Sequence, residues 1–373
     1  MNQKRQNQAH QETGSVESGR RAIERINAVL SEREREILRV VVTSFVQTAG
    51  PVGSRFVARN FGIGLSPASI RNTMSDLEER GFLEHPYTSA GRIPTELGYR
   101  TFVDQLMDSR SLSPADKKAL REEIEQIVGH TEDLLSESTR VLGSLTSLLG
   151  VVLSPKLSTG VLERLEVVKL SSTRAMFIIS VKSGLVKTMV FRVDLDVKRS
   201  TLDEVVALLN ERLVGLTLQE IRDSIHERVA DLTDMTGIVQ LTLKESGQLF
   251  NEVSEGGRLL FGNTQGLLSQ PEFREPEDLR TLIELIEDKD TVVSVIEDKH
   301  IEELTGIGQA TVSIGSENGV DRNFERYSIV TAQYKLGESI GTIGVIGPKR
   351  MEYGRIVSLV EGMAKVLTSS AVD

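Results

Sequence analysis

The feature that most constrains this chain is a helix start at Ser66-Pro67, which follows directly on a glycine-rich break. The serine oxygen is able to cap free amide groups, and proline suits the first position of a helix. Three apolar residues then recur at helical spacing, namely Ile70, Met74 and Leu77. Gly81 follows them at a position typical of a helix end. The sequence therefore predicts a capped helix that begins at residue 67 and stops before Gly81.

A second, shorter helix is predicted immediately before it, over residues 52–60. Its apolar positions recur at helical spacing and are expected on one face: Val52, Phe56, Val57 and Phe61. Gly62-Ile63-Gly64 then breaks the run, because glycine tolerates a turn that a helical run does not. A helix, a tight turn and a capped helix form the helix-turn-helix pattern, whose second helix is able to enter a major groove.

The residues after this pair predict a wing. Phe82-Leu83-Glu84 has the texture of a short strand, and a loop runs from His85 to Arg92. Thr95 is then placed to cap a further helix. A hairpin with a basic tip after a recognition helix is typical of a winged-helix DNA-binding module. Arg92, at that tip, is expected to enter a minor groove or to touch the DNA backbone.

The first helix of the module is predicted from Ser31, because Ser31 and Glu34 fit a capping box. Glu34, Arg35 and Glu36 are expected on its solvated face. The charge pattern of the module also favours DNA. Between residues 50 and 75 the basic residues are Arg55, Arg59 and Arg71, and there is no acid.

The other candidate DNA contacts lie on the two helices of the pair. Ser69, Arg71 and Asn72 occupy the first turns of the capped helix, where base edges come within reach. The donor pattern of Arg71 suits guanine and that of Asn72 suits adenine. Arg55 and Thr73 are expected to hold phosphates. A winged helix can also be a protein–protein module in which Arg71 only solvates its helix, but charge, cap and wing together favour DNA.

The rest of the chain predicts a helical segment followed by an interrupted sheet. Residues 115–149 have a helical pattern and are interpreted, within 109–155, as a helical linker. Strands are predicted at 162–170, 175–181 and 185–193, and again at 309–314, 327–334 and 340–346, before a helix over 351–367. The block between the two clusters is mostly helical. This order indicates an α+β chain with one antiparallel sheet that carries an insertion.

Composition excludes several classes of protein. The 373 residues include no cysteine, so disulfides, thiolate metal sites and cysteine nucleophiles are absent. The N-terminal residues lack the apolar core of a signal peptide, and no apolar run reaches the ~18 residues of a membrane helix. A soluble cytoplasmic protein is expected. The net charge of −10 is unevenly distributed, with +2 in residues 1–110 and −12 in the remainder.

No enzyme signature is present, and no cofactor or metal is expected. Gly341-Thr-Ile-Gly344-Val-Ile-Gly347 lacks the Gly-Lys-Ser/Thr ending of a phosphate-binding loop and is better explained as a strand and turn. The five histidines do not stand at metal-ligand spacing. No serine lies in a Gly-x-Ser-x-Gly elbow.

Three long motifs in order resemble the heat-inducible transcription repressor HrcA family. The first is SPASIRNTMSDLEERGFLE with TSAGRIPTELGYR, the second is FGNTQGLLSQPEF, and the third is GTIGVIGPKRMEYGR after a strand at 328–334. The resemblance spans most of the chain after residue 30. One departure is the wing, which reads His85-Pro86-Tyr87 where many members are expected to have Gln-Pro-His.

The resemblance implies a domain plan. The polar residues 1–20 by themselves predict a disordered tail. A winged-helix DNA-binding domain (21–108) and a helical linker (109–155) follow it. A GAF-like domain takes residues 156–198 and 275–373, and a dimerisation domain (199–274) is inserted in it.

The resemblance also implies a function and partners. A homodimer would bind double-stranded DNA at an inverted-repeat operator, the CIRCE element, and repress chaperone operons until heat shock. The GroEL chaperonin would help to keep it active. The alternative is a winged-helix regulator whose GAF-like domain senses a metabolite.

Overall fold

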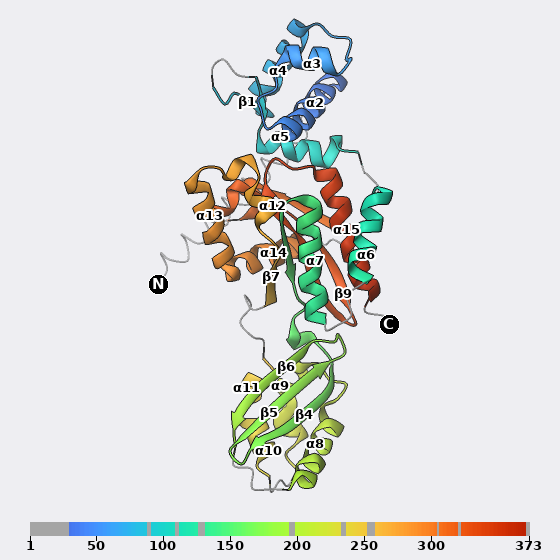
Figure 1. Cartoon of the computed structure of the whole chain (residues 1–373), viewed down its shortest axis with the longest axis vertical. Helices are drawn as coiled ribbons and strands as arrows, with labels where there is room; N and C mark the ends of the chain where they lie inside the picture. Colours follow the sequence, from blue (N-terminus) through green and yellow to red (C-terminus); the bar gives the residue numbers. More distant parts are fainter. Residues whose placement is uncertain are drawn as a thin grey trace, which may run out of the picture. The chain divides into compact units, whose positions relative to one another are not determined.

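The computed structural model describes residues 30–370 except 88–90, 109–111, 126–130, 194–197, 233–235, 252–257, 304–305 and 320–321 (Figure 1). The chain divides into two compact units. The first comprises residues 1–109 with 350–354, and the second comprises residues 110–349 with 355–373. The predicted tail over 1–20 lies outside the described residues. Within the described residues no helix is long and apolar enough to cross a membrane.

The first unit is built from short helices and a two-stranded antiparallel sheet. Its elements are α2 (Glu32–Thr48), α3 (Ser54–Asn60), α4 (Pro67–Glu79), β1 (Leu83–Glu84), β2 (Ile93–Pro94), α5 (Glu96–Thr101) and the π-helix η1 (Phe102–Leu106). The predicted capping box of Ser31 and Glu34 is confirmed, as is the cap of α5 by Thr95. The predicted apolar stripe of α4 is buried, because Ile70, Met74 and Leu77 lie in the core.

Glu34 does more than close the capping box. Its carboxylate accepts hydrogen bonds from the Ser31 backbone N–H at 2.7 Å and from Arg80 Nη1 at 2.6 Å. Arg80 is the residue that follows α4, so this ion pair ties the start of α2 to the end of α4. The prediction that Glu34 lies on a solvated face is therefore wrong.

The second unit contains a five-stranded antiparallel sheet in the order β7-β3-β10-β9-β8. Its strands are β3 (Leu149–Leu153), β7 (Leu259–Phe261), β8 (Ala310–Ile314), β9 (Tyr327–Leu336) and β10 (Ser339–Pro348). The accompanying helices are α6 (Pro114–Glu125), α7 (Thr131–Thr146), α12 (Gln265–Leu268), α13 (Pro276–Glu287), α14 (Lys289–Glu303) and α15 (Tyr353–Ser370).

A separate three-stranded antiparallel sheet is formed by β4 (Leu162–Ser171), β5 (Arg174–Val181) and β6 (Val186–Arg192). Four helices follow it in the chain: α8 (Arg199–Leu213), α9 (Leu218–Arg228), α10 (Ile238–Lys244) and α11 (Ser246–Leu249). Figure 1 shows the strands as one layer with the helices behind them. They share one apolar core, which includes Phe177, Leu209 and Phe250.

Two predictions about the second unit are wrong. The two strand clusters do not form one sheet, because β4–β6 pair only with each other, while β8–β10 belong to the sheet in which β10 pairs with β3 and β3 pairs with β7. Residues 109–155 are not a purely helical linker either, since they contain α6, α7 and the fully buried strand β3. A short apolar run such as Leu149–Leu153 does not distinguish a buried strand from a buried helix by periodicity.

Helix α7 packs directly against the five-stranded sheet because glycines leave room for its backbone. A Cβ atom on Gly150 of β3 would stand 2.1 Å from the Thr139 carbonyl oxygen of α7. A Cβ on Gly262, just after β7, would stand 2.6 Å from the same oxygen. Gly262 donates its N–H to the Gly150 carbonyl at 2.8 Å, so the two glycines form one smooth patch under the helix.

Replacing Gly150 with alanine is expected to destabilise the protein by roughly 1–3 kcal/mol, the usual cost of overpacking. The physical reason is that the helix backbone, rather than a flexible side chain, occupies the space. Urea denaturation of the full chain measures the effect. Gly247→Ala on α11 is the control, because no atom lies within 4 Å of its Cβ position. Equal unfolding midpoints for both variants would contradict this account.

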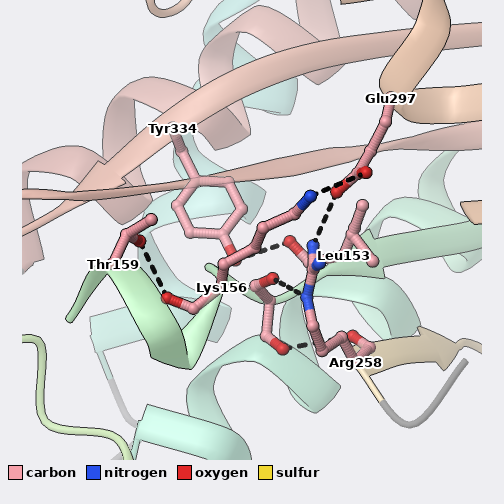
Figure 2. A network of polar contacts seen from close by, with 7 residues as sticks. Leu153, Lys156, Thr159, Arg258, Glu297 and Tyr334 are labelled. Atoms are coloured by element: carbon pink, nitrogen blue, oxygen red, sulfur yellow. Dashed lines mark hydrogen bonds and ion pairs between the residues drawn. The ribbon is translucent and has the colours of Figure 1, made fainter. Parts of the chain in front are cut away.

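A network of charged groups joins β3, β7 and α14 (Figure 2). Arg258, directly before β7, is only 7% exposed and donates from Nη2 to Glu297 at 3.0 Å and from Nε to the Ser154 carbonyl at 3.2 Å. Lys156 Nζ donates to the other oxygen of Glu297 at 3.1 Å. Beside them Tyr334 Oη donates to the Leu153 carbonyl at 3.3 Å. The segment leaving β3 and the residue entering β7 are thus held by the same carboxylate.

Burial by itself raises the pKa of Glu297, but the hydrogen bonds from Arg258 and Lys156 hold that pKa below its ordinary value of 4.5. A carboxyl with a lowered pKa contributes stability above its unfolded pKa and loses it as the pH falls. The difference in melting temperature between wild type and Glu297→Gln is therefore expected to be largest at pH 7, at a few degrees, and to shrink below about pH 4.5.

Glu287→Gln, an exposed glutamate on α13, is the control for this pH titration and is expected to track the wild type at every pH. A pH-independent difference between wild type and Glu297→Gln would show that the network contributes nothing through its charge.

Candidate nucleic-acid interface

The N-terminal end of α4 is held at the surface by the turn and cap that precede it. Gly62 and Gly64 adopt φ values of +56° and +70°, which L side chains rarely adopt. Ser66 Oγ accepts the Ser69 N–H at 3.1 Å, and Pro67 occupies the first turn. The predicted break and cap are both confirmed.

The other end of α4 is closed by Gly81. Its N–H donates to the Glu78 carbonyl, and the Phe82 N–H donates to the Leu77 carbonyl, each at 2.9 Å. These are the two hydrogen bonds of a Schellman motif, in which a glycine in the left-handed region ends the helix. Gly81 has a φ of +81°, as the motif requires.

The first turns of α4 expose Arg71 and Asn72, while Ser69 is half-buried. Arg55 and Arg59 are exposed on α3. Residues 51–75, which contain all of these positions, include no aspartate or glutamate. The result is a basic surface around the capped end of a helix, which suits a ligand with repeated negative charges.

Arg33 is a further cation of this surface that the sequence reasoning missed. It lies in the first turn of α2, is exposed, and donates from Nη2 to the Ser69 carbonyl at 2.7 Å. No sequence pattern links residues 33 and 69, so the arrangement of α2 against α4 was needed to find it.

Thr73 does not fit the predicted phosphate contact. Its side chain is only 4% exposed, and its hydroxyl donates to the Ser69 carbonyl at 3.2 Å. Thr73 lies one helical turn after Ser69, on the side of α4 that packs against the rest of the unit. We therefore assign it to the core.

The predicted apolar face of α3 is also wrong in part. Val52 and Val57 are buried, but Phe56 is 42% exposed and Phe61 is 36% exposed. Their rings pack edge to face with centroids 6.2 Å apart. Helix α3 ends at Asn60, so Phe61 lies outside it and helical spacing does not govern that residue. Phe56 lies inside α3, and its ring packs on the exposed Phe61 ring instead of on the core.

Arg92 is not at a free tip. Its backbone pairs with Val52 in an isolated antiparallel bridge, and its side chain is 13% exposed. Nη2 forms an ion pair with Glu78 Oε2 at 2.7 Å, and Nη1 contacts the His85 ring. The prediction that Arg92 reaches into DNA from the tip of the wing does not fit these contacts. The loop residues 88–90 lie outside the described part of the chain.

No group of three or more histidine, aspartate or glutamate side chains placed to hold a metal occurs among the described residues. A cavity of about 540 Å³ adjoins α2 in the first unit, and its charged lining comes from Glu32, Arg33, Arg35, Glu36 and Arg39. A smaller one of about 370 Å³ in the second unit is lined by Glu284, Glu287 and Asp288 among others.

The chain is similar to known proteins over most of its length. The family model described as "HrcA protein C terminal domain" matches residues 132–357. A heat-inducible transcription repressor HrcA of Chlorobium chlorochromatii (strain CaD3) is 43% identical over 343 residues, which cover 91% of this chain and 97% of the relative. The HrcA of Chlorobium phaeovibrioides (strain DSM 265 / 1930) is 44% identical over 351 residues, which cover 92% and 98%.

A solved structure described as a hypothetical protein has a TM-score of 0.59 and covers 92% of this chain and 99% of its own. At 23% identity it shows a shared mixed α+β fold and nothing about activity. The sequence relatives, which are named as repressors and not as enzymes, show the family. The chain belongs to the HrcA family of heat-inducible transcription repressors.

Proposed function

We propose that this chain acts in the cytoplasm as a dimeric winged-helix repressor of chaperone genes. In this proposal residues 21–108 form the winged-helix DNA-binding domain, and the five-stranded sheet belongs to a GAF-like domain. The predicted boundary at residues 198/199 is not kept, because β4–β6 share one apolar core with α8–α11. The inserted dimerisation domain of this proposal therefore comprises the three-stranded sheet together with α8–α11, instead of residues 199–274 alone. The operator is an inverted repeat, the CIRCE element, because a two-fold dimer presents one reading helix to each half-site.

The observation that carries the proposal is the capped N-terminal end of α4. Arg71 and Asn72 are exposed there within a stretch that contains no acid. A guanidinium is able to donate two hydrogen bonds to guanine, and a carboxamide pairs with adenine. Arg33 contacts the first turn of α4 at Ser69, and Arg55 and Arg59 are exposed on α3, which packs against α4. These three cations suit phosphates.

Arg71→Ala and Asn72→Ala are each expected to weaken operator binding by about 1–3 kcal/mol and to relax specificity at one base position. Gel shifts with a chaperone-promoter inverted repeat, a scrambled duplex and two salt concentrations measure both effects.

Arg280→Ala, an exposed arginine on α13, removes the same charge outside the proposed DNA-binding and dimerisation domains and is the matched control. Equal wild-type affinity for the two duplexes would leave only a basic surface. A regulator controlled by a metabolite would then be the better explanation, and ligand-dependent shifts in melting temperature would test it.

The family resemblance extends the proposal to the GroEL chaperonin, which keeps the repressor in its active form. A regulator of marginal stability suits this role, because ~1–2 kcal/mol changes the folded fraction severalfold or more. Purified protein is expected to lose operator binding on heating and to regain it with chaperonin and ATP. Binding that survives heating undiminished without chaperonin would contradict this part of the proposal.

A further inference from the structure

Three side chains at the base of the loop between β1 and β2 form a closed cycle of polar contacts. Glu78 comes from α4, His85 directly follows β1, and Arg92 directly precedes β2. Glu78 Oε2 pairs with Arg92 Nη2 at 2.7 Å, and Glu78 Oε1 contacts His85 Nδ1. Arg92 Nη1 contacts His85 Nε2, which completes the cycle.

The chemistry of the three groups determines which atom donates each hydrogen bond. A guanidinium has donors only, so His85 Nε2 accepts from Arg92. Nδ1 then carries the proton and donates to Glu78, which is a pure acceptor when ionised. Each member therefore holds both of the others.

The backbone holds the same corner of the loop. Val52 and Arg92 exchange two N–H···O hydrogen bonds of 2.9 Å. A Cβ on Gly91 would stand 2.4 Å from the Val52 carbonyl carbon and oxygen, so the residue before Arg92 has to be glycine for the Val52–Arg92 bridge to form. Arg92 is thereby seated beside α4, with its side chain 13% exposed.

The cycle is attached to the same helix that presents Arg71. Residues seven apart on a helix lie on nearly the same side, about 10.5 Å from one another along its axis. Glu78 thus holds the loop on the side of α4 that carries Arg71, two turns further along.

We propose that Glu78, His85 and Arg92 form a positioning joint that fixes the β1–β2 loop relative to α4. Arg92 is then a positioning residue that acts through Glu78 and does not touch DNA. This inference rests on the proposed function, because the joint is proposed to fix the position of the loop relative to α4 so that both fit the same DNA duplex.

Charge balance supports this assignment. If Arg92 left the cycle for a phosphate, Glu78 would remain without that partner as a carboxylate on the side of α4 that carries Arg71. Paired with Arg92, the same carboxylate adds no net repulsion. Arg92 is therefore expected to favour DNA binding more by neutralising Glu78 than by contacting the DNA itself.

A charge exchange tests the joint. Glu78→Arg and Arg92→Glu as single variants are each expected to weaken operator binding about tenfold or more. The double variant restores the ion pair with inverted polarity, and the imidazole is able to invert its tautomer to match. Its operator affinity is expected within about threefold of wild type. If Arg92 contacts DNA directly, the double variant will bind as poorly as Arg92→Glu.

If the charge-exchanged double variant does not fold, a second pair of variants tests the joint. A glutamine side chain is able to donate to Glu78 and to accept from Arg92, as the imidazole does, whereas alanine does neither. His85→Gln is expected to keep wild-type affinity, and His85→Ala to lose about as much as the single charge variants. Equal affinities for His85→Gln and His85→Ala would overturn the joint.

The two levels of the proposal fail differently. Wild-type protein that does not distinguish operator from scrambled duplex overturns the proposed function itself. Wild-type protein that does distinguish them, together with a double variant that is not restored, overturns only the joint. Melting temperatures of all variants, taken on the full chain, identify any loss of binding that comes from unfolding.

Discussion

The second unit depends on the close approach of one helix backbone to one strand. Thr139 of α7 presents its carbonyl oxygen to Gly150 of β3 and to Gly262 after β7, at separations that exclude any Cβ. Strand β3 lies between β7 and β10 in the sheet. The packing of α7 on β3 therefore also affects the position of β10 and, through it, of β9 and β8. The charged network at the end of β3 completes the arrangement, since Arg258 and Lys156 share Glu297 where the chain leaves and re-enters the sheet.

The elements that could be predicted from sequence are those specified by local chemistry. The cap at Ser66, the capping box at Ser31 and the glycine at the end of α4 each depend on residues a few positions apart. Strand pairing could not be predicted in the same way. The strands β4–β6 and β8–β10 have the same texture, and only long-range packing separates them into two sheets.

The positions of several side chains at the candidate interface could not be predicted from the sequence, for a related reason. Phe56 is predicted from helical spacing to be apolar core, and Thr73 is predicted to be a phosphate contact. Neither prediction contains information on which neighbours cover each side of a helix. Arg33 reaches Ser69 from another helix, and Arg92 is taken up by Glu78. Arg71 and Asn72 are exposed as the position of the cap suggested, and their contacts with bases remain a prediction.

Many arginines of this acidic chain hold its own carboxylates in place. Arg80 pairs with Glu34, Arg258 with Glu297, and Arg355 with Asp116 at 2.9 Å. Only a few arginines are therefore exposed on α3 and α4, in a chain whose net charge is −10. Attraction to DNA then comes from a local surface, and its strength should fall steeply with salt.

The sheet order also bears on how the chain is made. Leu153 of β3 pairs with Leu259 of β7 and with Thr342 of β10, so roughly 190 residues are synthesised before this strand has both partners, which takes about 10–40 s at ribosomal speeds. The core around β4–β6 comes from a continuous stretch and is complete well before that. A newly made chain therefore carries a folded insertion beside an apolar strand that waits for the C-terminal third. That waiting strand is the part of the nascent chain most exposed to misassembly.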